Sequence, residues 1–184
     1  MHHDVHGSDD RAASREEAYR HAQMLVALGE AKTAVDLMRR HVSRARASLP
    51  ENSPALVRAL SQYAEVLEAA DALAEAEYIR AEALEIVVSA ESATLAAAEA
   101  LLGYGLLLCK MHNYDGAVAR LKEAIRRAEE LQDVNELERQ MILARAWQSQ
   151  AQAFEALGEF SEASNALDVL LNVKRSLRFI SFTS

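Results

Sequence analysis

The sequence has little of what stabilises small secreted proteins or crosses membranes. It contains one cysteine, two prolines and six glycines in 184 residues, and only 5% of its residues are aromatic. A single cysteine excludes an intramolecular disulfide framework and is typical of a reducing compartment, so we expect a cytoplasmic protein. No stretch approaches the ~18 consecutive apolar residues of a membrane-spanning helix. The opening residues, MHHDVHGSDD, contain no apolar run that could act as a secretory signal.

Basic residues are also fewer than acidic ones. The chain has 20 Lys and Arg against 28 Asp and Glu, which gives a formal net charge of −8. Binding to nucleic acid through its phosphates needs a basic face, so we expect neither a nucleic-acid nor a membrane partner. The densest basic cluster is interleaved with acids, which predicts a solvated helix face with charge pairs; its members are Arg120, Lys122, Arg126 and Arg127, with Glu123, Glu129 and Glu130 between and after them.

What the chain does have is helix-forming composition. Ala, Leu, Glu and Arg dominate, and 51% of the residues are hydrophobic. No segment rich in Val, Ile or Thr alternates apolar and polar residues, so no strand is predicted. The length is sufficient for one domain with a substantial core. The composition therefore favours an all-α protein.

A short pattern recurs four times. Residues 27–34 read ALGEAKTA and residues 156–163 read ALGEFSEA; between them lie AADALAEA at 69–76 and KMHNYDGA at 110–117. The alanines that close these octets are 42, 41 and 46 residues apart. Apolar residues at helical spacing precede and follow each octet, so each octet is predicted to be the turn of a helical hairpin.

Small residues mark the first helix of each hairpin. Ala22, Ala64, Gly105 and Ala151 each lie 12 residues before the alanine that closes the turn. A missing side chain at this position lets the second helix cross close to the first. Three residues further on stand larger side chains that fill the crossing: Leu25, Leu67, Leu108 and Phe154.

These positions resemble the tetratricopeptide repeat (TPR) motif, W-x2-L-G-x2-Y followed by A, F and A. The fourth repeat matches best, through Trp147, Ala151, Phe154, Leu157-Gly158, Phe160 and Ala163. The spacing of about 42 residues is longer than the common form and is similar to the variety found in kinesin light chains. The resemblance implies an all-α, right-handed superhelical solenoid of four TPR-like hairpins.

The predicted boundaries follow from helix caps and from the repeat. We expect repeats at about 14–50, 53–90, 92–131 and 133–178, a disordered leader over 1–13 and a C-terminal tail over 179–184. Ser53-Pro54 predicts an N-cap with proline at the first helical position. Asp133 with Glu136 resembles a capping box that opens the fourth repeat, and the third is expected to begin near Ser92.

The sequence contains no motif that carries catalysis. It has no glycine-rich phosphate loop, no HExxH and no nucleophile elbow. Cys109 and His112 are three residues apart, but a metal site needs more ligands and a nucleophile needs an orienting third group. We therefore expect no enzyme activity, no cofactor and no metal, and Cys109 is predicted to be buried and inert.

The resemblance to TPR proteins also implies a partner-binding groove lined by the first helices. Carried onto this sequence, its main positions are Tyr19, Gln23, Arg58, Gln62, Glu65, Leu102, Leu106, Lys110, Arg145, Gln148 and Gln152. The basic and Asn residues with which TPR proteins clamp acidic chaperone tails are absent at the matching places. The full set of matching positions also includes Glu16, Arg20, Glu68, Glu99 and Glu155. It carries acids and bases in nearly equal number, which does not favour a purely acidic or purely basic ligand.

Two features leave alternatives open. The segment AAAEALLGYGLLLCKM at 96–111 is apolar on every side, so Leu102 and Leu106 are either buried between helices or anchor a partner peptide in the groove. In the last helix, Ala163, Leu167, Leu170 and Leu177 are predicted to face inward. A second stripe is then left to the tail, to solvent or to another chain: Ala166, Val169, Val173 and Ile180.

The sequence favours a non-enzymatic adaptor or scaffold that binds a segment or domain of another protein in its groove. One alternative is a module that self-assembles through its C-terminal end, where a homodimer would place Lys174, Arg175 and Arg178 against an acidic surface. The other is a regulatory domain that senses a peptide.

Overall fold

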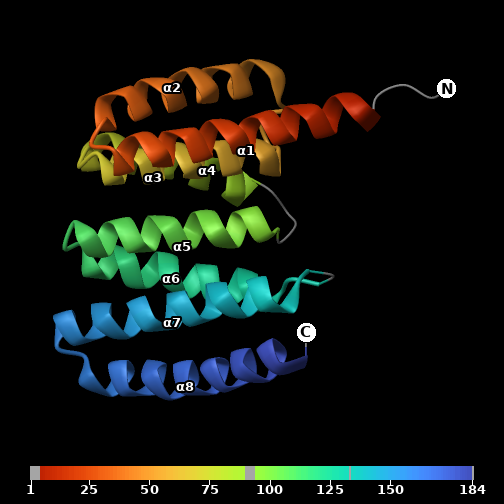
Figure 1. The fold of residues 1–184 in the computed structure, drawn as a ribbon. Coiled ribbons are helices and arrows are strands. Elements are labelled where there is room, and N and C mark those ends of the chain that lie inside the picture. Colours follow the sequence, from red (N-terminus) through yellow and green to blue (C-terminus); the bar gives the residue numbers. More distant parts are fainter. Residues whose placement is uncertain (1–4, 90–93, 133, 184) are drawn as a thin grey trace.

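The structure, a computed structural model, describes residues 5–89, 94–132 and 134–183. In these ranges all regular structure is helical (Figure 1). The eight helices are α1 (Val5–Ala27), α2 (Ala31–Ser48), α3 (Pro54–Ala69), α4 (Leu73–Ser89), α5 (Leu95–Lys110), α6 (Tyr114–Glu129), α7 (Glu136–Leu157) and α8 (Phe160–Thr183). The predicted all-α class is confirmed.

Consecutive helices form four hairpins that stack side by side (Figure 1). The odd-numbered helices pack against one another in one layer, α1 on α3, α3 on α5 and α5 on α7. α2, α4 and α6 each pack on the odd helices before and after them, and α8 packs on α7. Within the described ranges the even helices do not pack on one another. This arrangement is a helical solenoid, as the four octets predict.

Both ends of the chain are more helical than the sequence predicts. The structure has α1 begin at Val5, where a disordered leader is expected to residue 13, and α8 continue to Thr183, where a tail is expected from residue 179. The reason lies in the absence of breakers, because no Pro or Gly occurs from Ser8 to Leu28 or after Gly158.

The four predicted turns share one backbone conformation. Gly29, Asp71, His112 and Gly158 have φ angles between +60° and +81°, in the left-handed region. The amide of the next residue donates a hydrogen bond of 2.8–2.9 Å to the carbonyl five residues earlier, on Leu25, Leu67, Leu108 and Phe154 respectively. This 6→1 bond is the Schellman motif that ends a helix.

The small residues lie where the helices cross. Ala22, Ala64, Gly105 and Ala151 are all buried, and so are the alanines that follow each turn. A Cβ added to Gly105 would lie 2.7 Å from Cγ of Leu121 on α6. Glycine at this position therefore sets the distance between α5 and α6.

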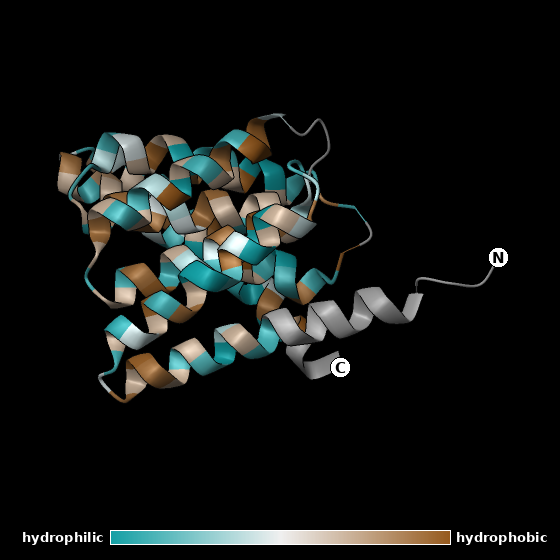
Figure 2. Cartoon of the chain, turned by 90° about the horizontal axis from the view of Figure 1, so that it is seen from above, coloured by the Kyte–Doolittle hydropathy of each residue, from teal (hydrophilic) through white to brown (hydrophobic). Residues whose placement is uncertain are grey.

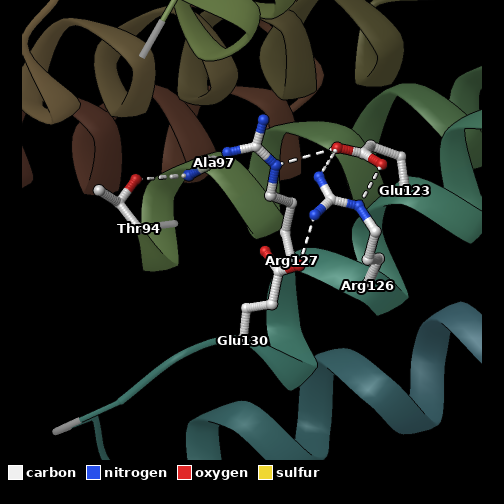
Figure 3. A network of polar contacts seen from close by, with 6 residues as sticks. All are labelled: Thr94, Ala97, Glu123, Arg126, Arg127 and Glu130. Atoms are coloured by element: carbon white, nitrogen blue, oxygen red, sulfur yellow. Dashed lines mark hydrogen bonds and ion pairs between the residues drawn. The ribbon is translucent and has the colours of Figure 1, made fainter. Parts of the chain in front are cut away.

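The caps begin the helices close to the predicted positions. Ser53 Oγ accepts a hydrogen bond from the Leu56 amide at 3.1 Å, and Pro54 is the first helical residue, as predicted. Thr94 caps α5 by accepting from the Ala97 amide at 3.1 Å (Figure 3). Asn135 caps α7 by accepting from the Leu137 amide at 2.9 Å. Ser92 and Asp133, the expected starts, lie outside the described residues.

The outer surface carries polar side chains, some of which form ion pairs. Figure 2 shows hydrophilic and hydrophobic residues alternating along the helices, as amphipathic packing requires. On α6, the guanidinium of Arg126 contacts Glu123 and Glu130 at 2.5 Å, and Arg127 donates to Glu123 at 2.9 Å (Figure 3). Arg126 and Arg127 of the basic cluster are thus paired with nearby acids, whereas Arg120 and Lys122 lie over the rings of Tyr104 and Phe154.

Candidate partner-binding groove

A cavity of about 550 Å³ opens on the layer of odd-numbered helices. Residues from α1, α3, α5 and α7 line it, together with one side chain from α4. We call this cavity the groove; it is lined by Glu16, Tyr19, Arg58, Ser61, Gln62, Glu65, Glu68, Arg80, Leu95, Ala96, Glu99, Leu102, Gly103, Leu106, Glu138, Met141, Ile142 and Arg145.

The groove is more acidic than the sequence predicts. Five glutamates line it against three arginines, and Arg80 is already paired with Glu68. The expectation of balanced charge is wrong for this cavity because the basic Lys110 lies outside its lining, whereas the acidic Glu138 of α7 lies inside. A bound group therefore meets an excess of carboxylates.

Arg80 reaches the groove from the other layer. Its guanidinium is buried, and Nε and Nη2 donate to Oε1 of Glu68 at 3.1 and 2.9 Å. It lies where a side chain of residue 103 would be, because a Cβ on Gly103 would come within 2.3 Å of Nη1. Lys110 holds the same segment by donating to the Glu68 carbonyl at 2.9 Å. Gly103 is therefore needed for the Arg80–Glu68 pair.

Hydrogen bonds between helices fix the N-terminal side of the groove. The hydroxyl of Tyr19 on α1 donates to Glu65 on α3, and Gln62 donates to Glu16 at 3.3 Å. Burial of the phenol, together with its bond to Glu65, raises the pKa of Tyr19 above its ordinary value. These contacts hold α1 against α3 and leave fewer free polar groups on this side.

The environment of Glu99 disfavours its charge. Loss of hydration in the groove raises the pKa of Glu99, and the nearby charges of Glu138 and Glu65 add to the rise. Arg58 and Arg145 oppose it. A cation placed beside Glu99 would stabilise its charged form.

The apolar part of the groove comes from α5 and α7. Leu102 is only 3% exposed and belongs to the core cluster, although it also lines the cavity, whereas Leu106 is half-buried. Met141 and Ile142 face them from α7, and Met141 is exposed. Leu102 therefore lies mainly in the core, as the first alternative predicts. Leu106 lies at the surface of the groove, where it could contact a partner, as the second alternative predicts.

The structure brings together seven of the eleven predicted groove residues: Tyr19, Arg58, Gln62, Glu65, Leu102, Leu106 and Arg145. Gln23, Lys110, Gln148 and Gln152 do not line the cavity; they are exposed near the turn ends of their helices. Glu138 and Met141 were missed although they share the helical face of Arg145 and could have been found from its spacing. Nothing in the sequence indicates Arg80, because its position depends on the packing of α4.

At the C-terminal end, the predicted outward stripe is partly wrong. Ala166 is buried, and Val173 packs on the core cluster. The buried residues of α8 are Ala163, Ala166 and Leu170, at spacings of three and four. Leu167, which was predicted to face inward, is exposed. Val169 lines a second cavity of about 530 Å³ between α6, α7 and α8, and Ile180 is half-buried.

No cluster of three or more His, Cys, Asp or Glu in the described part of the chain is placed to hold a metal ion. Cys109 is half-buried, and burial raises the pKa of its thiol. His112 turns toward Tyr114, with its Nδ1 2.8 Å from the hydroxyl. Among the described helices, none is both long and apolar enough to cross a membrane.

Comparison with known proteins gives structural matches alone. No family model matches the chain, and no curated protein sequence matches it. BtubC from P. vanneervenii matches with a TM-score of 0.72 at 14% identity, over 89% of this chain and 64% of that one. Kinesin-light-chain TPR-like repeats from Podosopora anserina match with a TM-score of 0.59 at 16% identity, over 88% and 95%. MamA of RS-1, a double mutant, matches with a TM-score of 0.60 at 16% identity, over 86% and 74%.

These matches and the stacked hairpins define the class. The chain has the fold of a TPR-like helical solenoid, as the repeated turns and small residues predict.

Proposed function

We propose that the chain is a non-enzymatic, cytoplasmic interaction module that holds a segment of another protein in the groove. The observation that carries this proposal is the cavity itself, which four helices from four hairpins build together. An apolar surface beside unbalanced charges is typical of a recognition site.

The lining indicates the chemistry of the bound segment. Leu106 and Met141 offer a surface for an apolar side chain. Glu99 and Glu138 offer negative charge in a cavity that has five glutamates against three arginines, one of which is already paired with Glu68. We therefore infer a segment with an apolar residue next to Lys or Arg, and the absence of a chaperone-tail clamp fits this choice.

Selection from a random peptide library on the immobilised chain tests the proposal. We expect enriched peptides to combine Lys or Arg with a large apolar residue, and the Glu99→Gln/Glu138→Gln variant to lose the preference for the basic residue. Leu106→Glu should abolish capture with helical circular dichroism and melting temperature near wild type. Gln148→Ala, on α7 but outside the groove, is the matched control and should bind as wild type does.

Two results would contradict the proposal. One is enrichment of acidic peptides, and the other is binding that survives Leu106→Glu in a folded protein.

A further inference from the structure

α8 repeats part of the packing face of α6, and among the described helices only α7 packs on it. α6 begins at Tyr114 and α8 at Phe160, so equivalent positions are 46 residues apart. Ile125 of α6 lies in one core cluster with Leu143 and Ala146 of α7, whereas Leu121 meets Gly105 of its own hairpin. The residue equivalent to Ile125 on α8, Leu171, is 54% exposed. Among the described helices, part of the face with which α6 receives α7 is thus left uncovered on α8.

The first helix has the opposite half of the same interface. Gly29 after α1 and Gly158 after α7 occupy the same place in their turns, so equivalent positions are 129 residues apart. On α7, Ala146, Gln150 and Ala153 are buried. Their equivalents on α1 are Glu17, His21 and Met24, which are all exposed, Met24 by 64%. Leu28, equivalent to Leu157, is exposed as well.

We propose that copies of this chain stack head to tail, with α8 of one copy packed on α1 of the next as α6 packs on α7. The two faces lie at opposite ends of the solenoid (Figure 1), so one copy can use both at once. Such an interface is heterologous and open, and adds further copies instead of closing a dimer.

The internal interface fixes which residues meet. Near the turns, Tyr114 and Val118 of α6 pack in one cluster with Ala153 and Leu157 of α7. Transferred to the ends, Phe160 of one copy lies beside Leu28 and Met24 of the next. All three side chains are exposed in the single chain. Stacking would remove this apolar surface from water.

Charge favours the same register. Ala128 of α6 shares a core cluster with Leu143 and Ala146 of α7, and its equivalent on α8 is Lys174. Stacking therefore brings Lys174, with Arg178 one turn further, toward Glu17 of the next copy. In an antiparallel contact between two α8 helices, by contrast, Glu17 and Met24 would lie outside the interface. The surface complementary to α8 is thus the N-terminal end of a second copy.

Sedimentation velocity of the full chain over a range of concentrations tests the proposal. We expect the mass to rise steadily with concentration and beyond that of a dimer. Leu171→Glu and Met24→Glu should each weaken association on the order of tenfold or more, because each places an unpaired carboxylate in the apolar contact. Mixing the two variants should restore a 1:1 complex, since one retains an intact α1 face and the other an intact α8 face.

Controls separate this interface from its alternatives. Val169→Glu changes another exposed residue of α8 on a different side of the helix and should leave association unchanged. Leu106→Glu, in the groove, should also leave it unchanged, so failure of the groove proposal does not decide this one. A wild type that stays monomeric overturns the proposal. So does a Met24→Glu variant that associates normally, which would indicate contact between two α8 helices.

Discussion

Single residues decide how closely the helices of this solenoid approach. Gly105 admits Leu121 of the facing helix, and Gly103 admits the guanidinium of Arg80. Both glycines lie within one helix, where glycine by itself lowers stability. Their presence in α5 is therefore explained by what packs on them and not by the backbone.

Gly105→Ala is expected to lower the free energy of unfolding by about 1–3 kcal/mol, the usual cost of overpacking a core. Urea denaturation measures this change. Leu121→Ala should cost less in the Gly105→Ala background than in the wild type, because it removes the γ and δ carbons that the new Cβ meets. If Gly105→Ala instead stabilises the chain, as helix propensity alone requires, the close crossing is not needed.

Glu123 should make stability depend on pH in the acid range. Hydrogen bonds from Arg126, and then from Arg127, lower the pKa of Glu123 to about 2, against about 4.3 for an unperturbed Glu. A lowered pKa contributes stability that is present above about 4.3 and lost as the pH falls toward 2. The pair is partly exposed, so the contribution is at most about 1 kcal/mol.

Urea denaturation at pH 6 and pH 3 checks this expectation. Glu123→Gln should destabilise the chain more at pH 6 than at pH 3. The difference between the two pH values should vanish when Arg126 and Arg127 are both replaced by Gln. A Glu123→Gln effect that is equal at both pH values would show that the network of Figure 3 does not act in solution.

At the scale of elements, α5 is apolar all round because it is covered on several sides. It packs on α3 and α7 in its own layer and on α4 and α6 in the other. The strip that faces the groove is one of its less covered sides, since Glu99 is exposed and Leu106 is half-buried. One helix thereby supplies both the centre of the core and the floor of the candidate site.

This division predicts different costs for two neighbouring leucines. Leu102→Ala should lower the free energy of unfolding by about 2–5 kcal/mol, as for a fully buried leucine, and Leu106→Ala by less, since its side chain is already half exposed. Chemical denaturation of the two variants measures both. Equal losses would place Leu106 in the core and remove the apolar anchor from the groove proposal.

At the scale of the whole molecule, each hairpin contacts only its neighbours, so stability is local along the solenoid. The central helices are covered from both directions, whereas α1 and α8 are each covered from one. The same asymmetry leaves Met24 and Leu171 exposed at the two ends. Core stability and the proposed end contacts therefore have a common origin.

Amide hydrogen exchange should follow this gradient. We expect the slowest exchange in α5 and the fastest in α1 and α8, because local opening needs the least free energy where the fewest contacts are lost. Mass spectrometry of peptic fragments resolves these helices. At concentrations at which copies stack, α1 and α8 should become more protected while α5 changes little. Uniform protection along the chain would contradict the local account.

Much of the fold was predictable because its determinants are short-range in the sequence. Each of the four turns is specified by a few neighbouring residues. The same type of hydrogen bond ends the helix before each turn. Capping by Ser53 and Pro54 is likewise local. The start of α1 and the end of α8 were misplaced because composition at a chain end gives a weaker signal than a cap does.

The groove was only partly predictable. Arg58, Gln62 and Arg145 were found because they share helical faces that the resemblance identifies. Arg80 was not, since it comes from the other layer and enters beside a glycine. The charge balance of the cavity was also misjudged, because it depends on how far along each helix the lining extends.

The sequence by itself determined the all-helical class, the four hairpins and their turns, because helix periodicity, small crossing residues and turn conformations act over a few neighbouring residues. Tertiary structure alone decided which of Leu102 and Leu106 is buried, which face of α8 is left uncovered, and that Arg80 pairs with Glu68. Each of these depends on atoms brought together from separate hairpins, at distances that sequence spacing does not specify.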